Sequence, residues 1–263
     1  MCALALTERE IIMPDLPRED DLFGRVLMDA FTGQGDEYYV RRDDNFTTRD
    51  SSKRYFRSWE ALPEHHRCLL DHARGQVLDI GAGAGQHALL LQENGLAVTA
   101  IDASPRAVEV CRKRGVQDAR VMDAHKLELP VRSYDTVLLM GNTLGIAGTP
   151  DGLRALLRRL HRIVRPGGQI LAEVNDYTAT HEMIHLRYHQ WNLARDRYPG
   201  SIRIRLEYQG ACSAEFDWLL IELADLKTIC AETGWKVSRC VQVTTETTYA
   251  MGFQRVEINL QDG

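Results

Sequence analysis

Residues 77–85 read Val-Leu-Asp-Ile-Gly-Ala-Gly-Ala-Gly, and this stretch decides the fold. Its first four residues predict a short buried strand, and its glycines predict a tight turn. From Gln86 to Asn94 the chain has the pattern of a helix, which Gly95 closes. In sheets of parallel strands, ligands bind beyond the carboxyl ends of the strands, where such a turn lies. The stretch therefore predicts a ligand site at residues 81–85.

Strands and helices alternate along the chain after this turn. Four further strands are predicted, at 97–101, 119–122, 136–140 and 169–174, and the fourth of the five, 136–140, is nearly all apolar, as is typical of a strand covered on both faces. Helices are expected between them, with Ser104 and Thr149 as suitable N-caps. This order predicts an α/β fold: a doubly wound, Rossmann-like sheet whose strands are mostly parallel.

The last third of the chain has a different pattern. Residues 177–197 are typical of a helical insertion, 201–208 alternate like a strand, and 222–233 suit a helix that Gly234 ends. Two further strands are expected at 236–245 and 254–260. Because they follow each other closely, we expect them to pair as an antiparallel hairpin.

Before residue 76 the sequence predicts helices and loops. An amphipathic helix is expected between Pro17 and Gly33, and a short helix over 63–73. We therefore divide the chain into a helical N-terminal cap, residues 1–75, and an α/β domain, residues 76–263. The helical insertion is interpreted as a lid over about 176–200.

Composition narrows the function classes. The 263 residues, with 44% apolar and 26% charged side chains, suit one large soluble domain or two small ones. A net charge of −5 argues against a nucleic-acid partner. No apolar run is long enough for a membrane span. The six cysteines are scattered without a C-x-x-C pair, so neither a disulfide framework nor a zinc knuckle is expected, and we expect a cytoplasmic protein.

The turn does not match the usual nucleotide motifs. A dinucleotide fingerprint needs a third glycine where Gln86 stands, and a phosphate-binding P-loop needs a Gly-Lys pair that is absent. Asp79 would repel a pyrophosphate but attract an ammonium or a sulfonium, the two cations of S-adenosylmethionine (SAM). Asp102 ends the second strand, where a carboxylate accepts hydrogen bonds from both ribose hydroxyls. Asp123 ends the third, next to Met122, and suits a base with an exocyclic amine.

These motifs, in this order, resemble those of class I SAM-dependent methyltransferases over roughly residues 70–175. The resemblance implies a seven-stranded sheet with an antiparallel last strand. It also implies a set of SAM-binding residues: the methionine part at Asp79, Gly81, Ala82, Gly83 and Gly85, the ribose at Asp102 and Ala103, and the adenine at Met122, Asp123 and Ala124.

The segment after the fourth strand is expected to face the reacting methyl group. Gly141 allows close approach to the methionine end of SAM, and Asn142 is a candidate to orient an amine or hydroxyl acceptor. The pair resembles the Gly-Asn-Ser segment of glycine-type N-methyltransferases; the alternative for Asn142 is a loop cap. His125 is a candidate general base. Its alternative is a polar wall or surface residue.

Substrate-binding candidates come from three segments: Tyr39 near the start, Asn175 and Asp176 after the fifth strand, and His181 and His185 in the insertion. Residues 181–185 also match H-E-x-x-H, a zinc-binding pattern when both histidines lie on one helix. The continuation of the zinc-protease motif is missing, because Tyr188 and Trp191 stand where it needs Gly and His. We therefore interpret the histidines as pocket-lining and expect no metal.

The interpretation is a SAM-dependent methyltransferase that transfers a methyl group to a nitrogen or oxygen of a small-molecule acceptor. Two alternatives stay open: a protein of this fold that binds the cofactor without catalysis, and an RNA methyltransferase. The acidic net charge argues against the second.

Overall fold

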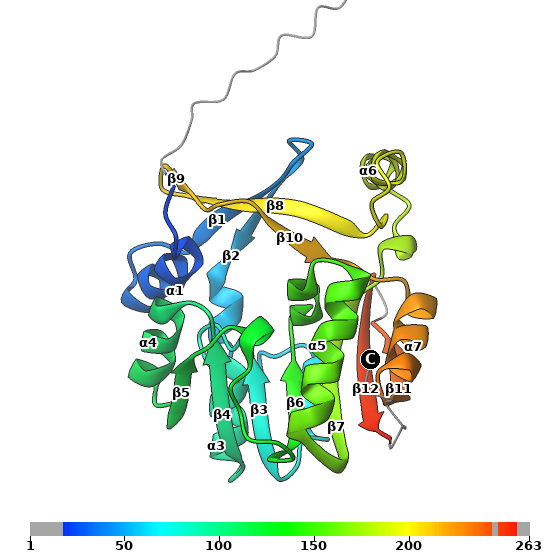
Figure 1. The fold of residues 1–263 in the computed structure, drawn as a ribbon. Coiled ribbons are helices and arrows are strands. Elements are labelled where there is room, and N and C mark those ends of the chain that lie inside the picture. Colours follow the sequence, from blue (N-terminus) through cyan, green and yellow to red (C-terminus); the bar gives the residue numbers. More distant parts are fainter. Residues whose placement is uncertain (1–17, 244–246, 257–263) are drawn as a thin grey trace, which may run out of the picture.

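The computed structural model describes residues 18–243 and 247–256. Its centre is a seven-stranded sheet in the order β11-β12-β7-β6-β3-β4-β5 (Figure 1). The strands are β3 (Gln76–Ile80), β4 (Ala97–Asp102), β5 (Asp118–Val121), β6 (Tyr134–Leu139), β7 (Val164–Asn175), β11 (Trp235–Gln242) and β12 (Thr248–Arg255). The five consecutive strands β7-β6-β3-β4-β5 are parallel to one another. The strand β12 runs antiparallel to both of its neighbours, β7 and β11. The Rossmann-like, mostly parallel sheet with an antiparallel last strand is confirmed.

Helices cover both faces of this sheet. On one face, α5 (Pro150–Ile163) and α7 (Leu223–Glu232) pack with the sheet into a core that contains Trp235 and Phe253. On the other face, α2 (Glu64–Leu70), α3 (Gln86–Glu93) and α4 (Pro105–Arg114) enclose a second core. The expected N-caps form: Ser104 accepts from the Ala107 N–H and Thr149 from the Gly152 N–H.

A second, antiparallel sheet lies across the carboxyl ends of the parallel strands (Figure 1). Its order is β10-β8-β1-β2, with the short β9 paired to β8. The strands are β1 (Glu37–Arg42), β2 (Thr47–Ser51), β8 (Ser201–Tyr208), β9 (Ala211–Cys212) and β10 (Phe216–Leu219). Helix α1 (Leu22–Thr32) packs beneath this small sheet and against α4. The small sheet therefore covers the edge at which the ligand site is expected.

Two expectations need correction. The N-terminal segment is not purely helical, because β1 and β2 form a hairpin. The strand β1 of this hairpin also pairs with β8, which lies more than 150 residues further along the chain. The last strand spans Thr248–Arg255 and was expected six residues later. It is the second strand from one edge of the sheet, between β7 and β11, and its Met251 and Phe253 are fully buried. Residues 1–17, 244–246 and 257–263 of the expected elements lie outside the described residues.

The insertion after β7 contains one helix, α6 (Met183–Leu193), which stands beside the small sheet (Figure 1). Short 3-10 turns complete the connections: η1 (Ser52–Phe56), η2 (Ala124–Lys126), η3 (Thr143–Ala147) and η4 (Tyr177–Ala179). Within the ranges that the structure describes, no helix has the length and apolar character needed to cross a bilayer.

Candidate active site

The glycine turn adopts a backbone that only glycine accommodates without strain. Gly81, Gly83 and Gly85 have φ angles of 68°, 56° and 74°. A Cβ atom on Gly81 would lie 2.8 Å from Cγ2 of Thr143, the first residue of η3. The turn after β3 and the segment after β6 therefore meet at the carboxyl edge of the sheet, as expected for a switch-point ligand site.

Asp79 is a buried carboxylate with an unused acceptor. It is 1% exposed, and among the described residues its Oδ2 atom has no hydrogen-bond partner. Burial, together with the nearby charge of Asp102, raises the pKa of Asp79 to about 7. An orphaned buried carboxylate beside a glycine turn fits a ligand that brings a positive charge, such as the ammonium of SAM.

Asp102 holds the turn in place. Its Oδ2 accepts the N–H of Gly83 and its Oδ1 the N–H of Ser104, both at 2.9 Å. Burial raises the pKa of Asp102. Each carboxylate oxygen can accept more than one hydrogen bond, so both stay competent to bind ribose hydroxyls.

Replacing Asp102 by Ala is expected to weaken binding of S-adenosylhomocysteine (SAH) by about 1–3 kcal/mol, the worth of hydrogen bonds to a charged acceptor. Isothermal titration calorimetry measures this change. Asp118→Ala, a substitution of the partly exposed acid that starts β5, is a control that should leave the affinity unchanged. An Asp102→Ala affinity equal to that of the wild type would remove the ribose assignment.

The expected adenine residues lie one strand further along the sheet. The Met122 N–H donates to the Asp102 carbonyl at 2.9 Å, which ties the ends of β4 and β5 together. Met122 is half-buried, Ala124 is buried, and Ala103 and Asp123 are exposed at this edge. Asp123 caps η2 by accepting the His125 N–H.

His125 is exposed, and its Nε2 lies 3.1 Å from the carbonyl oxygen of Ile146. Since a carbonyl only accepts, this contact places the ring hydrogen on Nε2. The ring is thereby tied to η3 at the surface. Its role as a general base stays a prediction.

Asn142 joins three segments. Its Oδ1 accepts the Asn175 N–H at 3.0 Å, and its Nδ2 lies 3.4 Å from the Leu219 carbonyl oxygen. The side chain is buried, and both Asn142 and its neighbour Gly141 have a left-handed backbone, with φ angles of 57° and 64°. These contacts give Asn142 the loop-fixing role that was its alternative; the catalytic role stays a prediction.

A cavity of about 500 Å³ lies between the small sheet, α6 and the ends of β7 and β12. Its walls combine apolar and aromatic side chains with hydroxyl, imidazole and amide groups and with three charged side chains, those of Arg42, Asp176 and Glu182. The lining residues are Val40, Arg42, Phe46, Thr48, Asn175, Asp176, Tyr177, Thr180, Glu182, His185, His189, Ile202, Ile204, Leu220, Thr247 and Thr248. This volume suits a small organic molecule.

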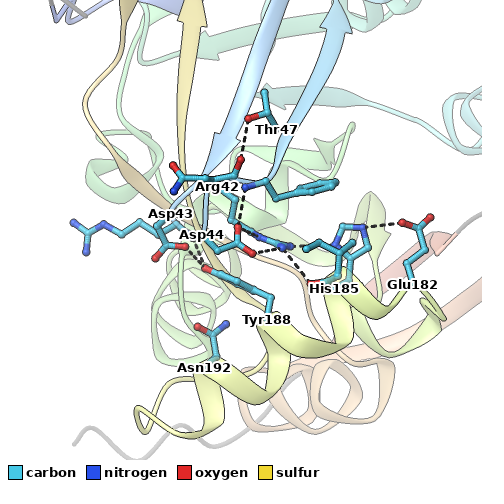
Figure 2. Close-up of polar contacts among 12 residues, drawn as sticks. Arg42, Asp43, Asp44, Thr47, Glu182, His185, Tyr188 and Asn192 are labelled. Carbon is cyan, nitrogen blue, oxygen red and sulfur yellow. Dashed lines mark hydrogen bonds and ion pairs between the residues drawn. The ribbon is translucent and has the colours of Figure 1, made fainter. Parts of the chain in front are cut away.

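Arg42 lines the cavity, and its polar contacts join the β1–β2 hairpin to α6 (Figure 2). It is 6% exposed, and its guanidinium binds Asp44 through two hydrogen bonds of 2.8 and 2.6 Å. It also stacks on the ring of Tyr188 at 4.0 Å. Its Nη1 donates to Nδ1 of His185 at 3.1 Å, because a guanidinium has no acceptor. The ring hydrogen of neutral His185 therefore sits on Nε2.

His189, one helical turn after His185, is the second histidine of the cavity. It is buried, and its ring packs edge-on against Tyr177 at 5.0 Å between centroids. Burial, His185 and Arg42 together lower the pKa of His189, so its imidazole is neutral near pH 7.

The structure brings together some of the expected substrate residues and separates others. Asn175, Asp176 and His185 line the cavity. Tyr39 does not: it is 45% exposed, and the alternation along β1 puts it on the face opposite to Val40. His181 is exposed and precedes α6, so residues 181–185 do not form a helix that presents both histidines on one side.

Sequence reasoning missed Arg42 and did not assign His189 to the site. A signal existed for both. Arg42 continues the period-two face of Tyr38 and Val40, and His189 continues the i, i+4 row of His185. Neither pattern reveals which faces meet, because β1 and α6 are far apart in the chain.

Three comparisons with known proteins agree. A family model described as "Methyltransferase domain" matches residues 77–168. A solved SAM-dependent methyltransferase from Bacteroides fragilis, in complex with SAH, is 30% identical, with a TM-score of 0.77 over 92% of this chain and 98% of that chain. Malonyl-[acyl-carrier protein] O-methyltransferase from Serratia marcescens is 34% identical over 101 residues, 38% of each protein.

A further curated relative is the ubiquinone biosynthesis O-methyltransferase of Methylocella silvestris, 33% identical over 132 residues, or 47% of this chain and 48% of that protein. The chain thus aligns with less than half the length of these curated relatives. The B. fragilis structure, in contrast, matches nearly the whole chain. The chain therefore belongs to the class I SAM-dependent methyltransferases. Its cofactor is SAM, and the orphaned Asp79 carboxylate and the glycine turn fit that group.

Proposed function

We propose that the chain methylates a nitrogen or oxygen of a small, largely apolar or aromatic molecule bound in the cavity. The observation that carries this proposal is the position of the cavity, which begins at Asn175 and Thr248. Asn175 in turn is hydrogen-bonded to Asn142, the residue after Gly141. An acceptor there would lie next to the segment that approaches the methionine end of the cofactor.

The charges around the cavity favour an acceptor without a large net charge. Arg42 is neutralised by Asp44, and the Asp176 carboxylate accepts hydrogen bonds from the N–H groups of Thr178 and Leu223. The third charged side chain, Glu182, lies 3.5 Å from His185 and is 74% exposed, so water solvates its charge. What remains for recognition is an apolar body and a few hydrogen bonds. Two relatives in the comparisons are named as O-methyltransferases, one of them in ubiquinone biosynthesis, which supports an oxygen acceptor.

Bound SAM supplies an electrophilic methyl group, and the residues of the chain orient the acceptor and exclude water. Asp79 and the glycine turn hold the amino-acid end of the cofactor, and Asp102 holds the ribose. The small sheet covers the site. We propose His189 as the group that takes the proton from an acceptor hydroxyl, because its imidazole lines the cavity and a neutral imidazole has a free nitrogen that can accept a proton.

Filling the cavity tests the proposal. Ile204→Trp should leave SAH affinity within about 2-fold of the wild type, because the cofactor residues are untouched, and should abolish methyl transfer. Transfer is measured with radiolabelled SAM against a panel of phenols, hydroxyquinones and amines. Arg203→Trp, the exposed neighbour on the same strand, is the control.

Three results would contradict the proposal. They are full transfer by the Ile204→Trp variant, transfer to RNA but to no member of the panel, and SAH binding without transfer to any acceptor. The last two would support the RNA methyltransferase and the non-catalytic alternatives respectively.

A further inference from the structure

A cluster of histidines and one carboxylate lies outside the residues discussed so far, at the α2 face of the large sheet. Nε2 of His66, on α2, is 2.6 Å from Oε2 of Glu173, on β7, and Nε2 of His65 is 3.9 Å from the same oxygen. One donor atom from each of the three side chains lies within 4.8 Å of the other two. Two helix residues that are adjacent in sequence thus converge on one strand residue.

This cluster is largely withdrawn from water. The side chains of His65, His66 and Glu173 are 17%, 12% and 15% exposed. Glu173 faces the core that contains Leu171, the strand neighbour two residues earlier. A carboxylate at such a position costs free energy unless cations or donors compensate it. Burial alone would raise the pKa of Glu173, but the hydrogen bond from His66 and the nearby histidines keep it below its usual value.

The surroundings orient the cluster as well. Nδ1 of His66 lies 3.3 Å from Nε2 of His87, the second residue of α3. This contact joins two imidazole nitrogens, so one ring donates a hydrogen and the other accepts it. Histidines that bind metals are commonly held in this way through the nitrogen that does not face the ion. The Gly141 N–H donates to Oε2 of Glu173 at 3.2 Å.

We propose that His65, His66 and Glu173 form a binding site for a divalent transition-metal ion, with Zn²⁺ as the best match. Two imidazoles and one carboxylate are a recurrent zinc set that leaves a fourth position for water or a ligand carboxylate. In tetrahedral coordination the donors lie about 3.4 Å apart. The 2.6 and 3.9 Å separations from Glu173 therefore need to change by less than about 1 Å each, within the reach of side-chain rotation.

From the sequence we expected no metal, and the residues considered then were His181 and His185 of the insertion. The proposed site uses different residues, which α2 and β7 bring together from more than 100 positions apart. An ion there would link α2 to β7 directly beneath Gly141. This metal-site proposal does not depend on the proposed methyl acceptor, because binding of the ion is measured without methyl transfer.

The test uses the full-length, untagged protein after treatment with a chelator. Co²⁺ is titrated while the visible absorption of the ion is recorded, and Zn²⁺ is then added as a competitor. We expect saturable binding of one Co²⁺ per chain, a spectrum typical of four-coordinate cobalt, and displacement by Zn²⁺. Glu173→Gln and His65→Ala should each weaken binding by at least about 10-fold.

The double variant His181→Ala/His185→Ala is the matched control and should bind Co²⁺ like the wild type. Circular dichroism and SAH calorimetry show that each variant is folded; His65→Ala suffices if Glu173→Gln fails to fold. Absence of saturable binding up to about 1 mM, unchanged binding in folded His65→Ala, or loss of binding only in the control would overturn the site. SAH binding is measured separately, so a failure of the metal site would leave the family assignment unchanged.

Discussion

Asp79→Asn is expected to weaken SAH binding by about 1.5–3 kcal/mol and, at the same time, to make the unliganded protein more stable. The affinity falls because the substitution removes the negative charge of the Asp79 carboxylate, whose buried Oδ2 atom would accept a hydrogen bond from the ligand ammonium. The gain in stability follows from removing a carboxyl group that is buried at a cost. Calorimetry with SAH and urea unfolding measure the two effects on one pair of proteins.

The pH dependence gives the sharper form of this prediction. Since folding raises the pKa of Asp79 from 3.8 to about 7, the native state binds more protons than the unfolded state between these values. Wild-type stability should therefore fall relative to the Asn variant as pH rises, by about 1.4 kcal/mol per unit between pH 5 and 6.5, and level off above pH 7. SAH affinity of the wild type should drop below pH 7, whereas the variant's should not.

The control is Asp151→Asn, which changes an acid whose side chain is 93% exposed. It should alter neither stability nor affinity. A stability difference between Asp79→Asn and the wild type that does not vary with pH would show that Asp79 ionises normally in the folded protein. Unchanged SAH affinity would remove the carboxylate from the cofactor site.

Arg42→Ala should destabilise the protein by about 2–4 kcal/mol. Removing one partner of a buried ion pair leaves the other uncompensated, and the substitution also removes stacking on Tyr188. The lower part of this range applies because the side chain of Asp44 is 25% exposed and recovers some hydration. Urea unfolding curves measure the change. Methyl transfer should be lost with little change in SAH affinity, because Arg42 belongs to the cavity wall.

Arg49→Ala is a matched control on the same hairpin. Arg49 pairs with Glu37, but the two side chains are 63% and 55% exposed, and such surface pairs contribute less than about 1 kcal/mol. Arg42→Lys keeps the charge without the two-pronged fork, so an intermediate stability is expected. If Arg42→Ala were as stable as Arg49→Ala, the guanidinium would not hold the hairpin to α6.

The parallel strands of the large sheet were predictable because the information for them is local, whereas β12 was expected six residues too late. A parallel strand buried on both faces is a short continuous apolar run, and turn glycines and N-caps mark the elements between. The β3–glycine turn–α3 unit and the acids at the ends of β4 and β5 follow from residues that are neighbours in sequence. The ends of parallel strands meet at one edge, so the predicted position of the cofactor site follows from the same pattern.

The small sheet and the acceptor cavity were not predictable in this way. The strand β1 mixes apolar and polar residues, and the five residues of β2 are all polar, so this stretch resembles a loop until β8 pairs with β1. That pairing joins residues more than 150 positions apart, so no local pattern contains it. The burial of Arg42 and the meeting of His66 with Glu173 depend on it or on similar long-range packing.

The amino-acid sequence by itself determined the Rossmann-like sheet, the glycine turn and the class of cofactor, since each depends on short-range patterning and on the charge of single residues. Only the tertiary structure decided which polar residues became buried, that Tyr39 faces solvent while Arg42 faces the cavity, and that the two histidines of residues 181–185 are separated. The physical reason is that burial and pairing are properties of faces brought together from distant segments, and desolvation acts on a side chain only once those faces meet.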